Sequence, residues 1–346
     1  MKNIAKLTLL TAMVSIAFSP LQAAPTKEES NGPLKTVKKD QKASFIYGDN
    51  LVTDVLLESD LPAVPVKESI KLRAAGLSSV MVTPNGDQFE TKMNPKDIEV
   101  FENAIRALEK AGHSAALFTD QSVTPRDLKN IVDSALSGGD ISIEKVIGAD
   151  NRVQITNTVT NPNWHTGRID VGCTGTLISQ RYVLTAGHCV ANGYGSWYNN
   201  LNFTVAQNGS YKPWGSESWT RAITTSAWFN SRNTNYDYGM IVLAAAPHGG
   251  HAGWGVYSGG THRVTGYPGD KPFGTMWTDS GSTSTSGSYR VCYTLDTAGG
   301  QSGSGIADTS GYVRGIHTTG STTQNCGTRM TSTVYNTLKN WIATYQ

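Results

Sequence analysis

The stretch Asp296-Thr-Ala-Gly-Gly-Gln-Ser-Gly-Ser-Gly305 decides how the rest of the chain is interpreted. Its four glycines and three hydroxyl side chains in ten positions cannot fill a hydrophobic core. Glycine instead allows tight turns and brings backbone N–H groups close to a ligand. If Ser302 is a nucleophile, its own N–H and that of Gly300 can hold the oxygen on which negative charge develops during attack on a carbonyl. Taken alone, such a stretch is more often a solvent-exposed loop.

Two upstream residues make this loop part of a catalytic pattern. His188 follows an expected β-hairpin that covers residues 175–185, and Asp237 comes just before an apolar strand expected at 239–243. Each of them alone is more often a loop histidine or a turn acid. In the order His188, Asp237, Ser302, however, the acid can hold the imidazole in one tautomer, and the imidazole can take the proton of the serine.

The composition divides the chain into two unlike parts. Residues 24–145 hold 15 Lys and Arg against 19 Asp and Glu, whereas residues 146–346 hold 12 against 8. All eight Trp and all four Cys lie in the second part, where short apolar runs alternate with Gly, Asn and Ser. This pattern predicts an all-β sandwich or barrel. Neither charge balance is strong enough to indicate a nucleic-acid or membrane partner.

The N-terminus has the features of a secretory signal peptide. A positively charged start is followed by an apolar run at 7–18, which is too short to span a bilayer, and by small residues up to Ala23. We therefore expect residues 1–23 to be removed and the product to be secreted and extracellular. In that oxidising compartment an even number of cysteines indicates disulfides rather than free thiols.

The acidic part predicts a small α+β unit without catalytic chemistry. Residues 24–45 have the composition of a flexible lead-in. Strands are expected at 51–57 and 79–82. Apolar residues at helical spacing, each run starting with proline and ending before glycine, predict helices over about 95–111 and 125–137.

Six short motifs resemble those of a known protein family. Thr185-Ala-Gly-His-Cys189, Asp237-Tyr-Gly-Met-Ile-Val-Leu243 and Gly299-Gly-Gln-Ser-Gly-Ser304 resemble the three catalytic motifs of chymotrypsin-fold serine proteases. More narrowly, Val146-Ile-Gly-Ala-Asp-Asn-Arg152, Thr297-Ala-Gly-Gly-Gln-Ser302 and Gly315-Ile-His-Thr318 are similar to bacterial glutamyl endopeptidases of the staphylococcal V8 and bacillus type. The resemblance covers roughly residues 146–346. It departs at Gly305, where a proline often stands.

The resemblance implies the fold and the domain boundaries. Two six-stranded antiparallel β-barrels, at about 146–247 and 248–346, would form an all-β protease domain with a C-terminal helix. The match at Val146 implies a mature N-terminus there, so that residues 24–145 would be an α+β propeptide. Such a propeptide would serve as an intramolecular inhibitor or a folding aid.

The resemblance also implies a role for each catalytic residue. Ser302 would attack the peptide carbonyl and form an acyl-enzyme, with His188 as its general base and Asp237 orienting the imidazole. The N–H groups of Gly300 and Ser302 would form the oxyanion hole. The implied activity is that of a secreted serine endopeptidase that needs no cofactor or metal.

Two other enzyme classes fit the sequence less well. An α/β-hydrolase requires Ser before Asp before His and a Gly-x-Ser-x-Gly elbow, whereas here the order is reversed and Ser304 stands at the last elbow position. A zinc protease of the His-Glu-x-x-His type lacks its motif, and His248 and His251 fall in the expected connection between the barrels. An inactive binding module on the protease fold remains the non-enzymatic alternative.

The four cysteines are expected to form two bridges. Cys173 and Cys189 flank the hairpin that leads to His188, and a bridge between them would fix that histidine at the end of a strand. Cys292 and Cys326 bracket the nucleophile loop. We therefore predict Cys173–Cys189 and Cys292–Cys326.

Two sets of residues predict opposite specificities. Asp296 lies six residues before Ser302, at the spacing where trypsin-like enzymes place the acid that binds Lys or Arg. Thr297 and His317, with the free amino group of Val146, instead resemble the site that receives a Glu side chain in glutamyl endopeptidases. The expected activity is thus cleavage after Glu, with Asp as a second accepted residue and a Lys/Arg-specific enzyme as the alternative.

Composition and maturation also bear on the choice between cleavage after Glu and cleavage after Lys or Arg. The expected propeptide holds nine Glu, whereas the mature part holds only Glu217, which would protect a Glu-specific enzyme from itself. The expected cut after Lys145 lies one residue beyond Glu144, so such an enzyme would need a separate activating protease or further trimming. The partners expected are therefore protein or peptide substrates, the propeptide and an activating protease, with the mature enzyme a monomer.

Overall fold

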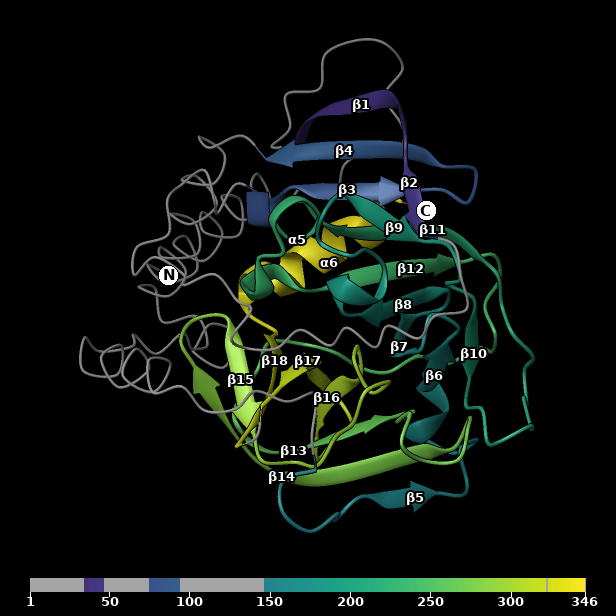
Figure 1. Ribbon diagram of the computed structural model, residues 1–346, viewed down its shortest axis with the longest axis vertical. Helices are drawn as coiled ribbons and strands as arrows, with labels where there is room; N and C mark the ends of the chain where they lie inside the picture. Colours follow the sequence, from purple (N-terminus) through teal and green to yellow (C-terminus); the bar gives the residue numbers. More distant parts are fainter. Residues whose placement is uncertain (1–33, 47–74, 94–145, 322, 346) are drawn as a thin grey trace, which may run out of the picture.

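The computed structural model describes residues 34–46, 75–93, 146–321 and 323–345 (Figure 1). The expected signal peptide, the strand at 51–57, both helices between 95 and 137 and the cut after Lys145 lie outside the described residues. Most of the regular secondary structure in these ranges is β-strand. Within these ranges no helix combines the length and the apolar character that crossing a bilayer requires.

The first sheet consists of nine strands, six of which come from the part of the chain after residue 146. These six are β10 (Phe203–Val205), β6 (Thr166–Ile169), β7 (Cys173–Ser179), β8 (Tyr182–Thr185), β12 (Gly239–Leu243) and β11 (Trp219–Thr225), in that spatial order. An isolated bridge between Phe203 and Glu217 joins the two ends of this row just before β11 begins. The buried side chains of β7, β8 and β12 fill the interior of this barrel.

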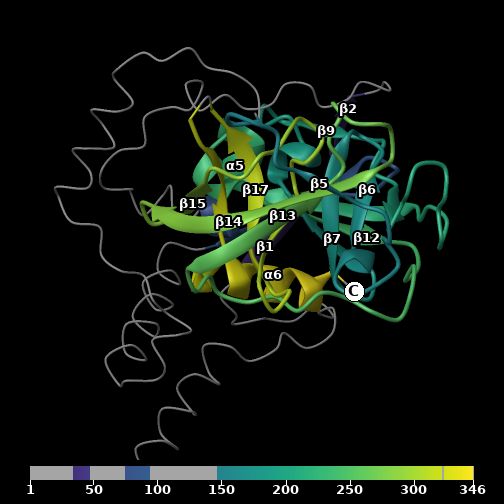
Figure 2. The same cartoon turned by 90° about the horizontal axis from the view of Figure 1, so that it is seen from below.

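The second sheet closes into a six-stranded barrel. Its order is β13 (Gly260–Gly266), β16 (Gly305–Asp308), β17 (Val313–Gly320), β18 (Asn325–Arg329), β15 (Arg290–Tyr293) and β14 (Met276–Ser286), and β14 pairs again with β13. The short β5 (Val153–Ile155) pairs with the first three residues of β14. Seen from below, β13 and β14 cross the near side of the molecule (Figure 2). The predicted two-barrel fold is confirmed.

The C-terminal helix α6 (Ser332–Thr344) packs on the first barrel, as expected. The hydroxyl of Thr331 accepts a hydrogen bond from the Val334 N–H and so caps the helix start. Leu338 and Trp341 are buried, and the Trp341 ring stacks on Tyr238 at 5.5 Å between ring centroids. The last element of the chain therefore closes the core that lies behind the first barrel.

Strands from before residue 146 extend the first sheet. The predicted strand at 79–82 is present as β3 (Ser79–Val82), and it pairs with β11 on one side and with β4 (Asp87–Met93) on the other. The outermost strand is β1 (Leu34–Lys42), and β2 (Ser44–Ile46) pairs in parallel with β9 (Ser196–Tyr198). The expectation of a flexible lead-in over 24–45 is wrong for residues 34–45, because backbone pairing with β4 and β9 does not require an apolar sequence.

Short helices complete the surroundings of the candidate site. They are the α-helix α5 (Ser226–Ser231) and the 3-10 helices η3 (Asn163–His165), η4 (Gly187–Cys189) and η5 (Thr234–Tyr236). The Thr225 hydroxyl caps α5 by accepting from the Trp228 N–H at 3.0 Å. The Trp228 indole then donates to the Ala191 carbonyl at 2.9 Å. Through these two bonds α5 is fixed beside η4, the helix that carries His188.

Candidate active site

His188 lies at the end of a buried strand, where its ring is held on two sides. It is part of η4, which begins two residues after β8 ends, and its side chain is almost fully buried. The Trp228 ring lies 6.1 Å from the imidazole between centroids. A side chain at Gly187 would come within 2.9 Å of the Trp228 ring, so glycine allows this close packing.

Asp237 holds His188 through both carboxylate oxygens. Oδ2 lies 2.8 Å from His188 Nδ1, and Oδ1 accepts a hydrogen bond from the His188 backbone N–H, also at 2.8 Å. The Asp237 side chain is completely buried, and its backbone carbonyl accepts from the Thr328 hydroxyl at 2.9 Å. A carboxylate placed in this way fixes the ring orientation and stabilises the protonated imidazole.

The loop that carries Ser302 packs directly against the first barrel. The Ser302 carbonyl accepts from the Thr174 N–H at 2.8 Å, and the Thr174 hydroxyl donates to the Gly300 carbonyl at 2.8 Å. A Cβ atom at Gly303 would lie 2.1 Å from the Thr185 hydroxyl, at the end of the strand that leads to His188. Since Gly303 also has a φ of 85°, only glycine fits there without strain. The nucleophile loop is thus brought to the same end of β8 as His188.

The backbone of this loop is arranged for tight turns. Gly300 has a φ of 101°, and a Cβ atom there would lie 2.5 Å from the Tyr267 carbonyl. The Gln301 N–H donates to the Ala298 carbonyl, and the Gly303 N–H donates to the His317 carbonyl. Within the described part of the chain, the Gly300 N–H donates to no protein group. It is therefore available as one of the two expected oxyanion donors.

Both predicted disulfides are present and bracket these elements. Cys173–Cys189 joins the start of β7 to η4, with its Cα atoms 6.0 Å apart. Cys292–Cys326 joins the directly paired strands β15 and β18. The first bridge ties His188 to the strand whose next residue, Thr174, binds the Ser302 carbonyl. The segments that carry His188 and Ser302 thus share one covalently fixed support.

The residues expected to recognise a substrate side chain lie together beside the nucleophile loop. His317, on β17, is fully buried, and its Nδ1 lies 2.6 Å from the Tyr293 hydroxyl. Thr297 is also fully buried, and among the described residues its hydroxyl has no hydrogen-bond partner. A buried hydroxyl without a partner costs free energy unless a ligand satisfies it. Tyr293 was not predicted from the sequence.

Comparisons with known proteins agree with this geometry. The trypsin family model matches residues 150–342, a span that includes His188, Asp237, the loop that carries Ser302 and both barrels. The chain belongs to the trypsin family. The glutamyl endopeptidase of Bacillus licheniformis is 38% identical over 224 residues, which are 58% of this chain and 70% of that protein. A protein of Bacillus subtilis named an extracellular metalloprotease is 35% identical over 252 residues, which are 64% and 80% of the two chains.

A solved structure supports the same relationship. The structure of a Glu endopeptidase in complex with MPD superposes with a TM-score of 0.54 and 30% sequence identity, and it covers 58% of this chain and 100% of its own. This trypsin-family chain is therefore a serine protease domain related to glutamyl endopeptidases. The part before residue 146 lies outside the family match.

Among the described residues of this trypsin-family chain, the candidate metal ligands form a disulfide or hydrogen bonds with protein groups. Among the described residues, one group of His and Cys ligand atoms lies within 4.8 Å, and it consists of Cys173, His188 and Cys189. The two sulfur atoms of this group are bonded to each other, so they are not thiolate ligands. His248 Nε2 lies 2.9 Å from the Trp164 carbonyl, while its Nδ1 accepts from the Gly250 N–H.

Asp296 binds the backbone of the segment that follows Val146. Its Oδ1 accepts from the Ile147 N–H and its Oδ2 accepts from the Asn151 N–H, each at 2.7 Å. Its own N–H donates to Asp279 Oδ2 at 2.8 Å, and its side chain is buried. Both oxygens of the carboxylate are therefore already hydrogen-bonded. In this position Asp296 fixes the start of the protease domain beside Thr297.

A buried guanidinium holds the same segment on its other side. Arg152 donates to Asp150 at 2.9 Å and to Asp270 at 2.5 Å, and Lys271 also donates to Asp150 at 2.7 Å. The hydrogen bonds from Arg152 hold the pKa of Asp150 well below its usual range. This arrangement joins residues 150–152 to the loop after Tyr267, and it was not predicted from the sequence.

We expect Arg152→Met to lower the free energy of unfolding by about 1–2 kcal/mol, because it removes the hydrogen bonds that the buried guanidinium donates to the exposed Asp150 and Asp270 carboxylates. Urea unfolding in a Ser302→Ala background, which prevents self-digestion, measures this change. Lys271→Met is the matched control, since Lys271 is the more exposed cation. Among the described residues it donates one hydrogen bond, to Asp150, and its ammonium lies over the Trp277 ring. The Lys271 substitution should cost less than about 1 kcal/mol. An equal or larger loss in the Lys271 variant would contradict the assignment.

Proposed function

We propose that this chain is a secreted serine endopeptidase in which His188, Asp237 and Ser302 form the catalytic triad. The observation that carries the proposal is the double contact of Asp237 with the ring nitrogen and the backbone N–H of His188, each at 2.8 Å. It gives the imidazole one orientation and one tautomer. In this tautomer the proton is on Nδ1, and Nε2 can act as the base. The family match and the nucleophile loop support the assignment of Ser302.

The proposed reaction proceeds in two balanced steps. Ser302 Oγ attacks the peptide carbonyl while its proton moves to His188 Nε2, and the N–H groups of Gly300 and Ser302 hold the resulting oxyanion. The C–N bond then breaks, and the leaving amine takes the proton from His188. A water molecule attacks the acyl-enzyme in the second step, with His188 again accepting and returning the proton.

The proposed specificity is for Glu at the residue before the cut. A Tyr293 hydroxyl that donates to Nδ1 of His317 keeps the single N–H proton of the neutral ring on Nε2, which can then donate to a carboxylate. The unpartnered Thr297 hydroxyl is a second donor, and the Val146 amino group would add a positive charge. Two relatives named glutamyl endopeptidases or Glu endopeptidases support this specificity.

The Lys/Arg-specific alternative is less well supported by the contacts of Asp296. An ammonium or guanidinium bound there would compete with the Ile147 and Asn151 N–H groups for both carboxylate oxygens. Losing those bonds would also release the start of the protease domain. Under the proposed function Asp296 therefore positions the segment that carries Val146 and does not contact the substrate.

Tyr293→Phe and His317→Ala test the specificity site. Tyr293→Phe removes the hydroxyl that fixes the histidine tautomer, and we expect kcat/KM for a Glu substrate to fall by about tenfold. His317→Ala removes the donor itself, and we expect a loss of about 100-fold or more. The measurement is kcat/KM on matched peptides with Glu, Gln or Lys before the cut.

The control for both variants is labelling of Ser302 by a small fluorophosphonate, which needs the triad but not a Glu side chain. Its rate should change by less than about threefold in each variant. Unchanged Glu cleavage in His317→Ala would contradict the proposed specificity. No labelling of the wild-type chain at Ser302 would favour the inactive binding module.

The remaining parts of the proposal concern maturation. Residues 1–23 would be the signal peptide and residues 24–145 a propeptide, with Val146 as the mature N-terminus. The pairing of β3 with β11 supports a propeptide that contributes to folding, because it covers an edge of the first barrel. N-terminal sequencing of the secreted product tests both boundaries. The mature enzyme would act on protein or peptide substrates as a monomer.

A further inference from the structure

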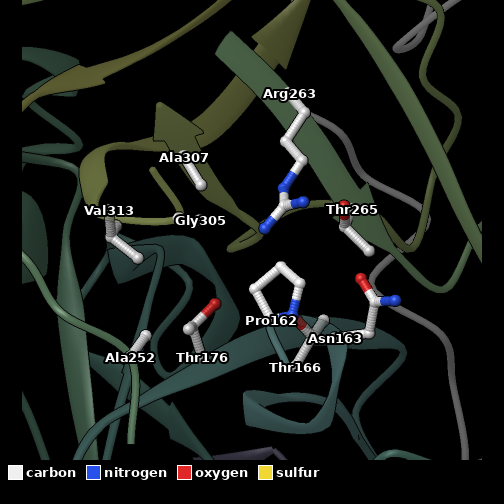
Figure 3. A pocket seen from close by; sticks show the side chains of 11 residues that line it. Pro162, Asn163, Thr166, Thr176, Ala252, Arg263, Thr265, Gly305, Ala307 and Val313 are labelled. Carbon is white, nitrogen blue, oxygen red and sulfur yellow. The ribbon is translucent and has the colours of Figure 1, made fainter. Parts of the chain in front are cut away.

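A second site of interest lies between the barrels, in a pocket that the proposed reaction does not use. Two neighbouring strands of each barrel line it, and Pro162 and Asn163 on one side and Ala252 on the other complete the lining (Figure 3). The lining residues used below are Thr166 and Thr176 from the first barrel, Arg263 and Thr265 from the second, and Pro162 and Asn163 from the segment before β6. Thr166 and Thr176 are direct partners in the pairing of β6 with β7.

Strand alternation gives this pocket its charge. Arg263 and Thr265 lie on the same face of β13, and Arg263 is paired with Ala307 of β16, which lines the pocket as well. His262 and Asp308, the next pair along the same two strands, fall on the opposite face. The pocket is therefore lined by a cation and hydroxyl groups, and no acidic residue is among its lining residues.

The Arg263 guanidinium points into the middle of the pocket (Figure 3). The side chain is only partly exposed, and within the described ranges no protein group forms a hydrogen bond or ion pair with it. Burial lowers the pKa of Arg263, and the field of Asp308 opposes this effect. Asp308 itself is bound to Arg314 at 2.8 Å. A guanidinium offers five N–H donors, so a partly buried one without an acceptor favours binding of an anion.

Thr176 provides a second, independent unsatisfied group in the same pocket. It is 4% exposed, and within the described part of the chain its hydroxyl has no hydrogen-bond partner. A Cβ atom at Gly305 would lie only 3.0 Å from this hydroxyl, so the absence of a side chain there keeps the space in front of it open. Gly311 similarly leaves open the space near Arg263 Nη2, which a Cβ atom would approach to 3.8 Å.

The size of the pocket limits what it can hold. The space open to the centre of a water-sized group is about 20 Å³, which is too little for an organic cofactor but sufficient for a small polar group. We propose that this pocket binds a small oxyanion, a phosphate or a carboxylate group, through the Arg263 guanidinium and the Thr176 hydroxyl. Arginine matches such oxygens with two parallel hydrogen bonds. Because Arg263 and Thr176 belong to different barrels, the anion would link the two halves of the fold.

Thermal unfolding of the full chain carrying Ser302→Ala tests this proposal. Potassium phosphate, sulfate, acetate and chloride are compared at equal ionic strength and pH, so that charge screening is the same. Sulfate and phosphate also stabilise folded proteins through exclusion from the surface, so this general rise is measured in Arg263→Gln and subtracted. At saturation we expect an oxyanion to raise Tm by about 3 °C above the value in chloride. A rise with phosphate and sulfate identifies a tetrahedral ligand, whereas a rise with acetate alone identifies a carboxylate. No selective rise with any oxyanion overturns the proposal.

Arginine variants test whether the oxyanion-dependent rise in Tm comes from this pocket. Arg263→Gln should leave only the general rise, and Arg263→Lys should reduce the oxyanion-dependent rise, because lysine keeps the charge but not the paired donors. Arg221→Gln is the matched control: Arg221 is partly exposed on β11 and does not line the pocket. It should retain the full rise. A rise of the same size in Arg263→Gln overturns the proposal.

Threonine variants keep the test valid even if Arg263→Gln does not fold. Thr176→Val removes a buried, unsatisfied hydroxyl, so in chloride its Tm should equal or exceed that of the parent. The oxyanion-dependent rise should nevertheless shrink by about half or more. Thr204→Val is the control, since the Thr204 hydroxyl is also buried without a described partner but lies outside the pocket. Equal oxyanion-dependent rises in Thr176→Val and in the parent overturn the assignment of Thr176.

Discussion

Ser302→Ala should lower kcat/KM by about 10⁵-fold while the protein remains folded. The proposed nucleophile forms the acyl-enzyme, and the variant has no Oγ at this position to attack the substrate carbonyl. Any residual rate would come from the oxyanion donors and substrate binding alone. The measurement compares kcat/KM of matured preparations of the variant and the wild type on one Glu peptide.

Ser304→Ala is the matched control for this experiment. Ser304 lies in the same loop, is equally buried, and donates its backbone N–H to Gln301. We expect it to retain turnover within about tenfold, because its hydroxyl has no role in the proposed reaction. Circular dichroism and Tm of both variants should match those of the wild type. Normal peptide hydrolysis by Ser302→Ala, or an equal loss in Ser304→Ala, would contradict the assignment of the nucleophile.

The segments that form the candidate site were predictable because their signals are local. The glycines around Ser302 and the Gly-His-Cys run that carries His188 each lie within a few residues of the group they support. The structure adds the physical reason for two of these glycines. Gly303 and Gly300 approach the backbone of the first barrel and of Tyr267 more closely than any side chain would allow. Short apolar runs between turns likewise predicted an all-β sandwich or barrel without the pairing order of the strands.

The contacts around the specificity site were not predictable, because they join residues far apart in the sequence. Tyr293 reaches His317 across 24 positions, and Arg152 reaches Asp270 across 118. Neither pair leaves a periodic or local pattern. The same holds for β3, which was predicted as a strand but not as a neighbour of β11, since strand propensity does not specify a partner.

Asp296 shows most clearly the difference between what a local sequence pattern predicts and what the folded chain shows. Its spacing from Ser302 fits the acid of a Lys/Arg-binding pocket, and sequence analysis leaves that role open. Its carboxylate oxygens, however, are bound to backbone N–H groups of Ile147 and Asn151, 149 and 145 positions away. Which groups occupy an acceptor decides whether it can bind a substrate, and that information exists only in the folded chain.

The chain that begins at Val146 should cleave Glu substrates about 100-fold faster, in kcat/KM, than the same chain begun at Lys145. The Ile147 N–H is fixed to Asp296 at 2.7 Å, so the group on its N-terminal side has little freedom. One extra residue would move the α-amino charge by about 3.8 Å and leave a neutral peptide in its place. Loss of a charge from a buried carboxylate site typically costs 2–5 kcal/mol, which corresponds to a drop of this size or more.

Two preparations that differ only in this residue provide the measurement. Each is released from a tagged precursor by a site-specific protease and assayed on Glu and Gln peptides. The Glu over Gln ratio should fall in the extended form. Fluorophosphonate labelling of Ser302 should proceed at the same rate in both, within about threefold, because it does not use the amino group. Equal Glu cleavage by the two forms would contradict the role proposed for Val146.

Processing of the precursor separates the two specificities in one further experiment. Wild-type mature enzyme is added in trace amount to the Ser302→Ala precursor, and the new N-terminus is sequenced. A Glu-specific enzyme can cut after Glu144 and leave Lys145 attached, so it would produce the weakly active form and need another protease for completion. A Lys-specific enzyme would release Val146 directly. Direct release, together with faster cleavage of Lys than of Glu peptides, would overturn the glutamyl proposal and make Asp296 the specificity residue despite its bonds to Ile147 and Asn151.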